Sequence, residues 1–187
     1  MTSSGASSRA AGSSYPAVYL AGLHLEGRSV VLVGGGRVVA RRLETLLAAG
    51  ALVRVIAPWV DPRVGVAAQA GRITWEARRY APGDLAACWY AMACTDDPLV
   101  NAQVVAEAES RRLFCVRADA GGLGQAVTPA SGRCDHVQFA LTTGGDYRLS
   151  RRLRDELAAR LRQVLDATGS GAGARGDRSV DRGRAAD

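Results

Sequence analysis

The sequence contains no lysine, and this absence excludes several kinds of chemistry. Its 24 basic side chains are all arginines and, against 18 acidic ones, give the 187-residue chain a net charge of +6. A chain without lysine has neither the phosphate-binding lysine of a Walker motif nor a lysine for a Schiff base. Arginine forks bind carboxylates and phosphates through paired hydrogen bonds, so the surplus suits a polycarboxylate substrate. Codon bias, with basic faces that are merely solvated, is the alternative explanation.

Other features are scarce as well. The arginines are dispersed and aromatic residues make up only 5% of the chain, so we expect no nucleic-acid partner. No apolar run approaches the roughly 20 residues of a membrane span, and we expect no membrane partner. The four cysteines form no C-x-x-C pair, so neither structural disulfides nor a metal site are expected. Such cysteines fit a reducing, cytoplasmic location.

The clearest motif is the stretch 29–50, which reads SVVLVGGGRVVARRLETLLAAG. An apolar, β-branched run meets three glycines, and apolar residues then recur with the spacing of one helix face. Strand, tight turn and helix in this order let an anionic group approach the free N–H groups of the helix N-terminus. The expected ligand is the pyrophosphate of a dinucleotide. A tight turn that binds no nucleotide is the alternative interpretation.

The dinucleotide fingerprint is incomplete at two places. Gly34 and Gly36 fill the first two positions of G-x-G-x-x-G, but Val39 stands at the third. A second strand, expected over 51–57, is not followed at once by the acidic residue that usually binds the ribose, and Asp61 comes late. The residues themselves therefore leave the choice between NAD and NADP open.

The rest of the chain alternates between strand and helix patterns. We expect a short helix between Asp61 and Gly71, strands over 72–79, 88–95, 113–118 and 136–142, and a helix from Pro98 to Arg111 capped by Asp97. A glycine-rich loop begins at Gly121 and precedes the strand over 136–142. Leucines recur every three or four residues from Leu149 to Leu165, which predicts an amphipathic helix. Its apolar stripe packs on the sheet or pairs with a second copy of the chain.

Together these elements predict an α/β fold, a Rossmann-like parallel sheet with flanking helices and a C-terminal amphipathic helix. We expect a disordered lead over 1–14, an NAD-binding domain over 15–120, a substrate-side and dimerisation segment over 121–168, and a disordered tail over 169–187. Asp119 follows the strand over 113–118, at the sheet rim where ligands bind in open α/β sheets.

An ordered set of short segments resembles the N-terminal domain of siroheme synthase, the precorrin-2 dehydrogenase and sirohydrochlorin ferrochelatase family. The set covers roughly Tyr15 to Leu165 and has nearly the family's spacing. Its members are VVLVGGGRVVARR from Val30, AGALVRVIAP from Ala49, GRI from Gly71, RRYAPGDL from Arg78, ACTDDPLVNAQV from Ala93, FCVRAD from Phe114, Pro129 with Ala130, and ALTTGG from Ala140.

The resemblance implies an NAD-dependent oxidation of precorrin-2 to sirohydrochlorin in siroheme biosynthesis, with insertion of ferrous iron in some members. It implies a homodimer, and Asp119 as the general base. Implied cofactor contacts are Gly34, Gly36, Arg37, Val38, Pro58, Trp59 and Thr95. Implied substrate contacts are Thr142, Thr143, Gly144, Gly145 and Arg148.

The chain departs from the family pattern in three places. The loop after Asp119 reads AGGLGQAVT without the usual proline and aromatic residue, and Tyr147 and Arg148 stand where the family has Ser and Pro. After the predicted C-terminal helix we expect a short polar tail in place of the helical region that in relatives helps to form the dimer and the substrate cleft. Two other functions therefore stay open, a non-catalytic NAD(H)-binding regulatory module and a partner of a separate methyltransferase.

Overall fold

The computed structural model describes residues 17–169, which form two compact units, residues 17–128 and residues 129–169. The first unit ends after Thr128. The expected lead over 1–14, and the expected tail apart from Gly169, lie outside the described residues.

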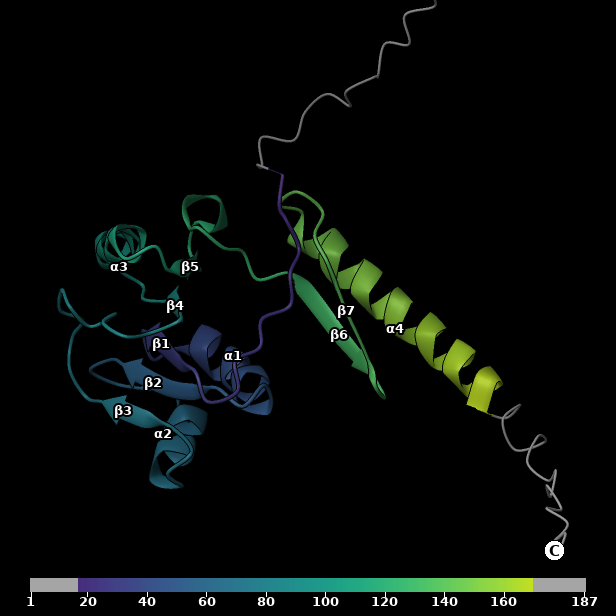
Figure 1. Cartoon of the computed structure of the whole chain (residues 1–187), viewed down its shortest axis with the longest axis horizontal. Coiled ribbons are helices and arrows are strands. Elements are labelled where there is room, and N and C mark those ends of the chain that lie inside the picture. Colours follow the sequence, from purple (N-terminus) through teal and green to yellow (C-terminus); the bar gives the residue numbers. More distant parts are fainter. Residues whose placement is uncertain (1–16, 170–187) are drawn as a thin grey trace, which may run out of the picture. The chain divides into compact units, whose positions relative to one another are not determined.

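The first unit is built on a parallel sheet of five strands. They are β1 (Ser29–Val33), β2 (Leu52–Ile56), β3 (Thr74–Glu76), β4 (Tyr90–Ala93) and β5 (Phe114–Arg117). The order across the sheet is β3-β2-β1-β4-β5, which Figure 1 shows from the bottom of this unit to its top. Val33 pairs in register with Ile56 on one side and with Ala93 on the other, so the central strands end level. The predicted Rossmann-like sheet is confirmed.

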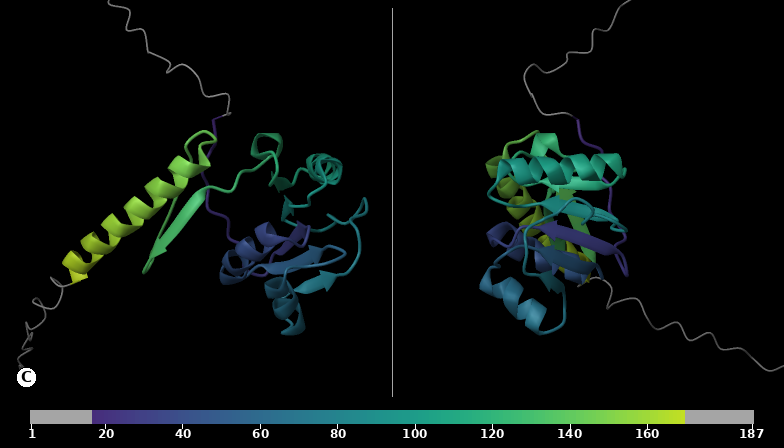
Figure 2. Two further views of the ribbon diagram at one scale, coloured as in Figure 1. Left: turned by 180° about the vertical axis from the view of Figure 1, so that it is seen from behind. Right: turned by 90° about the vertical axis from the view of Figure 1, so that its left-hand side faces the viewer.

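Helices cover both faces of this sheet. They are α1 (Arg37–Ala48), α2 (Pro62–Gln69) and α3 (Pro98–Ser110). Alternate residues of a strand face opposite sides, so Val30 and Leu32 pack with α1 and α2, whereas Val31 and Val33 pack with α3. All four are buried, as expected for the central strand of a doubly covered sheet. Figure 2 shows the same sheet and helices from two further directions.

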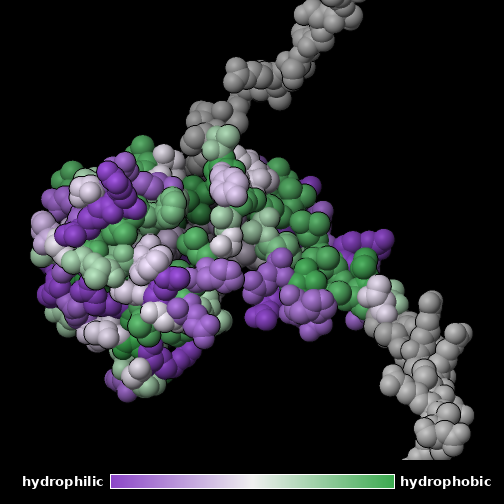
Figure 3. All heavy atoms as spheres, viewed as in Figure 1, coloured by the Kyte–Doolittle hydropathy of each residue, from purple (hydrophilic) through white to green (hydrophobic). Residues whose placement is uncertain are grey.

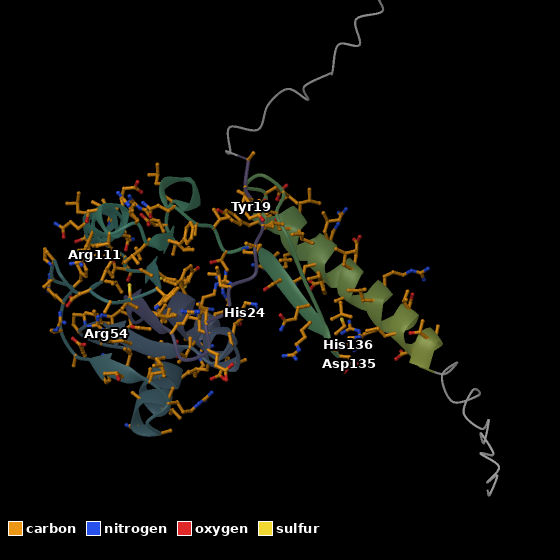
Figure 4. The ribbon with its side chains drawn as sticks, in the orientation of Figure 1. Tyr19, His24, Arg54, Arg111, Asp135 and His136 are labelled. Carbon is orange, nitrogen blue, oxygen red and sulfur yellow. The ribbon has the colours of Figure 1, made fainter. Side chains whose placement is uncertain are left out.

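The second unit is a β-hairpin with one long helix beside it. Strands β6 (Ala130–Cys134) and β7 (Val137–Leu141) pair antiparallel, and α4 (Tyr147–Gly169) lies along them. Asp135 and His136 stand at the hairpin tip (Figure 4). Nδ1 of His136 lies 2.9 Å from Oδ2 of Asp135. The strand predicted over 136–142 is thus present, but it belongs to this hairpin and not to the parallel sheet.

The prediction was wrong for β6, because the sequence predicts only a glycine-rich loop there. Its residues, ASGRC, are mostly small or polar and carry little strand propensity. Pairing with β7 supplies the strand geometry instead. At Gly132 a Cβ atom would lie 2.4 Å from the ring of Phe139, so the glycine makes room for the cross-strand aromatic side chain. A short 3-10 turn, η1 (Gly121–Leu123), also interrupts the expected loop.

Apolar side chains remain exposed in both units. Along α4, Leu149, Leu157 and Val164 keep 37%, 45% and 44% of their surface, and green apolar atoms are visible along this helix in Figure 3. In the first unit, residues 17–25 form no regular structure and Tyr19 is 91% exposed. Within residues 17–169, no helix has the length and apolar character needed to cross a bilayer.

A matched pair of valines on α2 tests the packing of this helix. Val64 is fully buried in the core and Val66 is 65% exposed. We expect Val64→Ala to lower the free energy of unfolding by about 2 kcal/mol, from lost apolar burial and the cavity left behind. Val66→Ala should change it by less than about 0.5 kcal/mol. Urea unfolding of both variants measures the difference, and equal losses would contradict the arrangement of α2.

Candidate functional site

The strand order changes direction at β1, in the middle of the sheet. The chain leaves β1 toward β2 and β3 on one side, and β4 leads to β5 on the other. In open α/β sheets, ligands bind where the connections diverge in this way. Gly34 follows β1, Thr95 comes shortly after β4 and Asp119 shortly after β5, so residues from both sides of the sheet reach its carboxyl edge.

The first two glycines of the turn after β1 have no room for side chains. Gly34 has a φ of +117°, and a Cβ atom there would lie 2.4 Å from the carbonyl oxygen of Cys94. At Gly35 a Cβ atom would lie 2.0 Å from the carbonyl oxygen of Trp59. The N–H of Asp61 donates to the carbonyl oxygen of Gly35 at 2.7 Å. The turn is therefore packed against the segments that follow β2 and β4, and Gly35, which the fingerprint leaves undefined, is as constrained as Gly34.

The N-terminus of α1 is open to an anion. Its N-cap is Gly36, which has no side chain to bond the first N–H groups, and its first turn carries no acidic residue. Uncapped N–H groups and the helix dipole together attract a phosphate group. Val39, at the third fingerprint position, is fully buried in the core between α1 and the sheet. A valine therefore fits where the fingerprint has a small residue.

Arginines from two helices line a depression beside this turn. Arg37, Val38 and Arg41 of α1 and Arg63 of α2 surround a volume of about 240 Å³. We call these four residues the arginine pocket. Arg63 is paired with Asp61, with Nε 3.0 Å from Oδ1 and Nη2 2.9 Å from Oδ2, which lowers the pKa of Asp61 to about 2. The family resemblance implies Arg37 and Val38 as cofactor contacts but not Arg41 or Arg63. The i, i+4 spacing of Arg37 and Arg41 is nevertheless a signal that both share one helix face.

Pro58 and Trp59 lie at the end of β2, as predicted. Both are exposed, Trp59 to 60%, and the indole Cη2 of Trp59 is 4.0 Å from where a Cβ atom of Gly36 would stand. The indole therefore borders the glycine turn and leaves one flat apolar surface beside it.

Asn101 connects the ends of β4 and β5. It is fully buried, and its Oδ1 accepts hydrogen bonds from the Thr95 N–H at 3.0 Å and the Thr95 hydroxyl at 2.8 Å. Its Nδ2 donates to the carbonyl oxygen of Thr95 and to Oδ1 of Asp119, both at 2.9 Å. A buried amide with all these partners fixes the position of the groups that it bonds. Asn101 lies in the segment ACTDDPLVNAQV that carries the family resemblance, but the sequence assigns it no role, because only the fold brings Asp119 to its side chain.

Asp119 is also held by Arg117. The guanidinium donates from Nε to Oδ1 and from Nη2 to Oδ2, each at 3.0 Å, and from Nη2 to the carbonyl oxygen of Pro98 at 3.0 Å. The Arg117 hydrogen bonds, with a smaller contribution from Asn101, hold the pKa of Asp119 below its usual value. The carboxylate therefore stays ionised at neutral pH, but it is a weaker proton acceptor than an unpaired carboxylate.

The predicted substrate residues share one turn of the second unit. Thr142 to Gly145 connect β7 to α4, and Gly144 and Gly145 have φ values of +62° and +101°. The Thr143 hydroxyl lies 2.6 Å from the Asp146 carbonyl oxygen and 2.6 Å from the Ser150 hydroxyl, so it helps to hold the start of the helix. Asp146 caps α4 by accepting from the N–H groups of Arg148 and Leu149, which replaces the Ser and Pro of the family pattern. Thr142 and the Arg148 side chain are exposed.

Comparisons with known proteins show which family the chain resembles. Residues 21–130 match the family model described as "Putative NAD(P)-binding". Siroheme synthase 3 of Aeromonas hydrophila subsp. hydrophila is 37% identical over 150 residues, which are 80% of this chain and 32% of that protein. The siroheme synthase of Citrobacter koseri is 38% identical over 142 residues, 75% of this chain and 31% of that protein. The chain thus spans about a third of the length of these curated relatives.

One solved structure is similar to this chain in fold. SirC, precorrin-2 dehydrogenase, superposes with a TM-score of 0.69 and is 25% identical in sequence. The superposition covers 80% of this chain and 76% of that one.

The pairing of Asp119 predicts a pH-dependent contribution to stability. The pKa of Asp119 in the folded protein lies below the unfolded-state value of about 4. The ionised carboxylate therefore contributes its full stabilisation above about pH 4, and this contribution is lost as the pH falls through the folded-state pKa. We expect Asp119→Asn to be less stable than the parent at pH 7, with a difference that shrinks below about pH 4. Urea unfolding across this range measures it, with Asp155→Asn on exposed α4 as the charge control. A difference that does not change with pH would contradict the assignment.

Proposed function

Because the chain belongs to the NAD(P)-binding family of siroheme synthase N-terminal domains, we propose that it oxidises precorrin-2 to sirohydrochlorin, with a nicotinamide dinucleotide as hydride acceptor. One observation supports this most directly. The uncapped N-terminus of α1, which follows the glycine turn, and Asp119, which follows β5, both lie at the carboxyl edge of the same parallel sheet. The reaction belongs to siroheme biosynthesis, and the expected location is the cytoplasm.

In this proposal, different residues at the carboxyl edge of the sheet bind the cofactor and accept the proton. The N–H groups that follow Gly34 and Gly36 hold the pyrophosphate, and Pro58 and Trp59 border the adenosine. Thr95, held by Asn101, closes the cofactor side at the end of β4. A bound nicotinamide would supply the carbon that accepts the hydride. The oxidation also releases a proton, and Asp119 is the candidate base that takes it.

The lowered pKa of Asp119 places a condition on this role. Its oxygens accept from Arg117 and Asn101, and both partners stabilise the ionised form. Precorrin-2 is a polycarboxylate, and substrate carboxylates that compete for Arg117 would raise the pKa of Asp119 toward its ordinary value. The proton acceptor would thus be activated when substrate arrives. Ferrous iron insertion, which displaces pyrrole protons, would use the same carboxylate, with iron as a substrate.

The turn before α4 is proposed as the substrate side. Thr142, Gly144 and Arg148 provide exposed hydroxyl, backbone and guanidinium groups that suit carboxylates, Gly145 beside them is partly exposed, and Thr143 shapes the turn. The favourable feature is the exposed Arg148 guanidinium, because guanidinium groups donate paired hydrogen bonds to carboxylates.

One observation favours a second function, a non-catalytic NAD(H)-binding regulatory module. Both oxygens of Asp119 are already bonded within the protein, an arrangement that also serves a purely structural role. In that case the dinucleotide would bind without turnover. Association with a separate methyltransferase is compatible with either function.

Anaerobic turnover of precorrin-2 distinguishes these functions. With NAD and NADP supplied in parallel, we expect the parent to form sirohydrochlorin, followed by its absorbance and that of the reduced nicotinamide. Asp119→Asn should lower kcat by about 100-fold or more, because the amide cannot accept the proton. Glu44→Gln, which removes an exposed carboxylate of α1, is the control and should keep full activity.

The outcomes separate cleanly. Undiminished turnover of Asp119→Asn would remove Asp119 from the mechanism. A parent that binds dinucleotide and does not oxidise precorrin-2 would favour the regulatory module. Adding ferrous iron to the finished reaction reports iron insertion through the change in the sirohydrochlorin spectrum.

We infer a homodimer that forms through α4. Leu149, Leu157 and Val164 are spaced along one helix and keep between 37% and 45% of their surface exposed, which suits pairing with a second copy. We expect light scattering after size exclusion to give the mass of two chains for the parent and of one chain for Leu157→Glu. Arg160→Gln, on the same helix, should remain dimeric. A monomeric parent would contradict this inference.

A further inference from the structure

The end of β2 lacks the group that normally selects NAD. In dinucleotide-binding folds an acidic residue there accepts the hydroxyl groups of the adenosine ribose, whereas an arginine nearby accommodates a 2′-phosphate. Here Ala57, Pro58 and Trp59 follow the strand, and the first acid is Asp61. Asp61 accepts three hydrogen bonds from Arg63, from the backbone N–H, Nε and Nη2. Its carboxylate is therefore engaged within the protein.

The arginine pocket carries the opposite charge. Arg37 and Arg41 stand one helical turn apart on α1, and Arg63 reaches the same depression from α2. Within the described chain, neither Arg37 nor Arg41 forms an ion pair with a carboxylate, whereas Arg63 has only Asp61 as its acidic partner. Three guanidinium groups near one carboxylate leave this depression with a surplus of positive charge. Guanidinium groups bind phosphate oxygens through two parallel hydrogen bonds.

The pocket is fixed in relation to the glycine turn. The Asp61 N–H donates to the carbonyl oxygen of Gly35, and this bond ties the start of α2 to the turn before α1. The N-terminus of α1, where the pyrophosphate is proposed to bind, therefore lies beside the start of α2, which carries Arg63. An adenosine that leaves the pyrophosphate along Trp59 would bring its ribose toward the start of α2.

We propose that the arginine pocket binds the 2′-phosphate of NADP(H), so that the oxidation uses NADP in preference to the NAD that the family resemblance implies. The inference rests on the proposed function for its choice of ligand, a nicotinamide dinucleotide. It assigns Arg41 and Arg63 to the 2′-phosphate and leaves Arg37, at the first position of α1, beside the pyrophosphate.

Binding of two adenosine nucleotides tests this without any turnover. Titration calorimetry would compare 2′,5′-ADP, which carries the 2′-phosphate, with 5′-AMP, which lacks it. We expect the parent to bind 2′,5′-ADP about tenfold or more tightly, as expected for added hydrogen bonds between charged groups. The preference should fall as salt is raised, because these arginines face solvent. Arg41→Gln and Arg63→Gln should each reduce the preference and leave the affinity for 5′-AMP unchanged.

Arg72→Gln is the matched control, since it removes the same charge from a residue that precedes β3, at the opposite edge of the sheet. It should retain the full preference. Equal affinity of the parent for the two nucleotides would overturn the inference, while the proposed oxidation would stand if NAD supports turnover. Loss of preference in Arg72→Gln equal to that in Arg41→Gln would overturn it as well, because the effect would then reflect total charge. Failure of the parent to bind either nucleotide would overturn both this inference and the proposed function.

Discussion

The close approach of three backbone segments at Gly34 and Gly35 is the constraint on which the sheet edge depends. Side chains there would overlap the carbonyl oxygens of Cys94 and Trp59. Only glycine allows β1 to end beside both neighbouring connections, and the first turn of α1 then stays uncapped and accessible. Thus the packing of the fold and the opening of the proposed phosphate site arise from the same absence of side chains.

The charges along this edge differ from one side to the other. At the end of β5, the carboxylate of Asp119 is matched by Arg117 and held in place by buried Asn101. Beside α1 the guanidinium groups outnumber the carboxylates, and of the three arginines in the pocket only Arg63 is paired with a described carboxylate, that of Asp61. A cofactor that is anionic at its adenosine end and reacts at its other end fits this arrangement. The surplus of guanidinium groups on the basic side suits binding of phosphate.

Most of the first unit follows from local patterns. The buried run before the glycines, the Asp97 and Pro98 helix start and the fully apolar strand β4 are visible because alternation, capping and burial leave a signature in adjacent residues. Strand β6 leaves none. Its small and polar residues become a strand only because β7 pairs with them and Phe139 fills the space above Gly132.

The same distinction applies to the site. The sequence alone determines the glycine turn, the helix behind it and the presence of Asp119 after a strand, because each is encoded within a few neighbouring residues. Tertiary structure decides what these groups contact: Asn101 meets Asp119, and Arg63 joins Arg37 and Arg41 around one depression. Those residues are far apart in the chain, and only the order of strands in the sheet brings them to one edge. Their contacts therefore depend on topology, which no local pattern specifies.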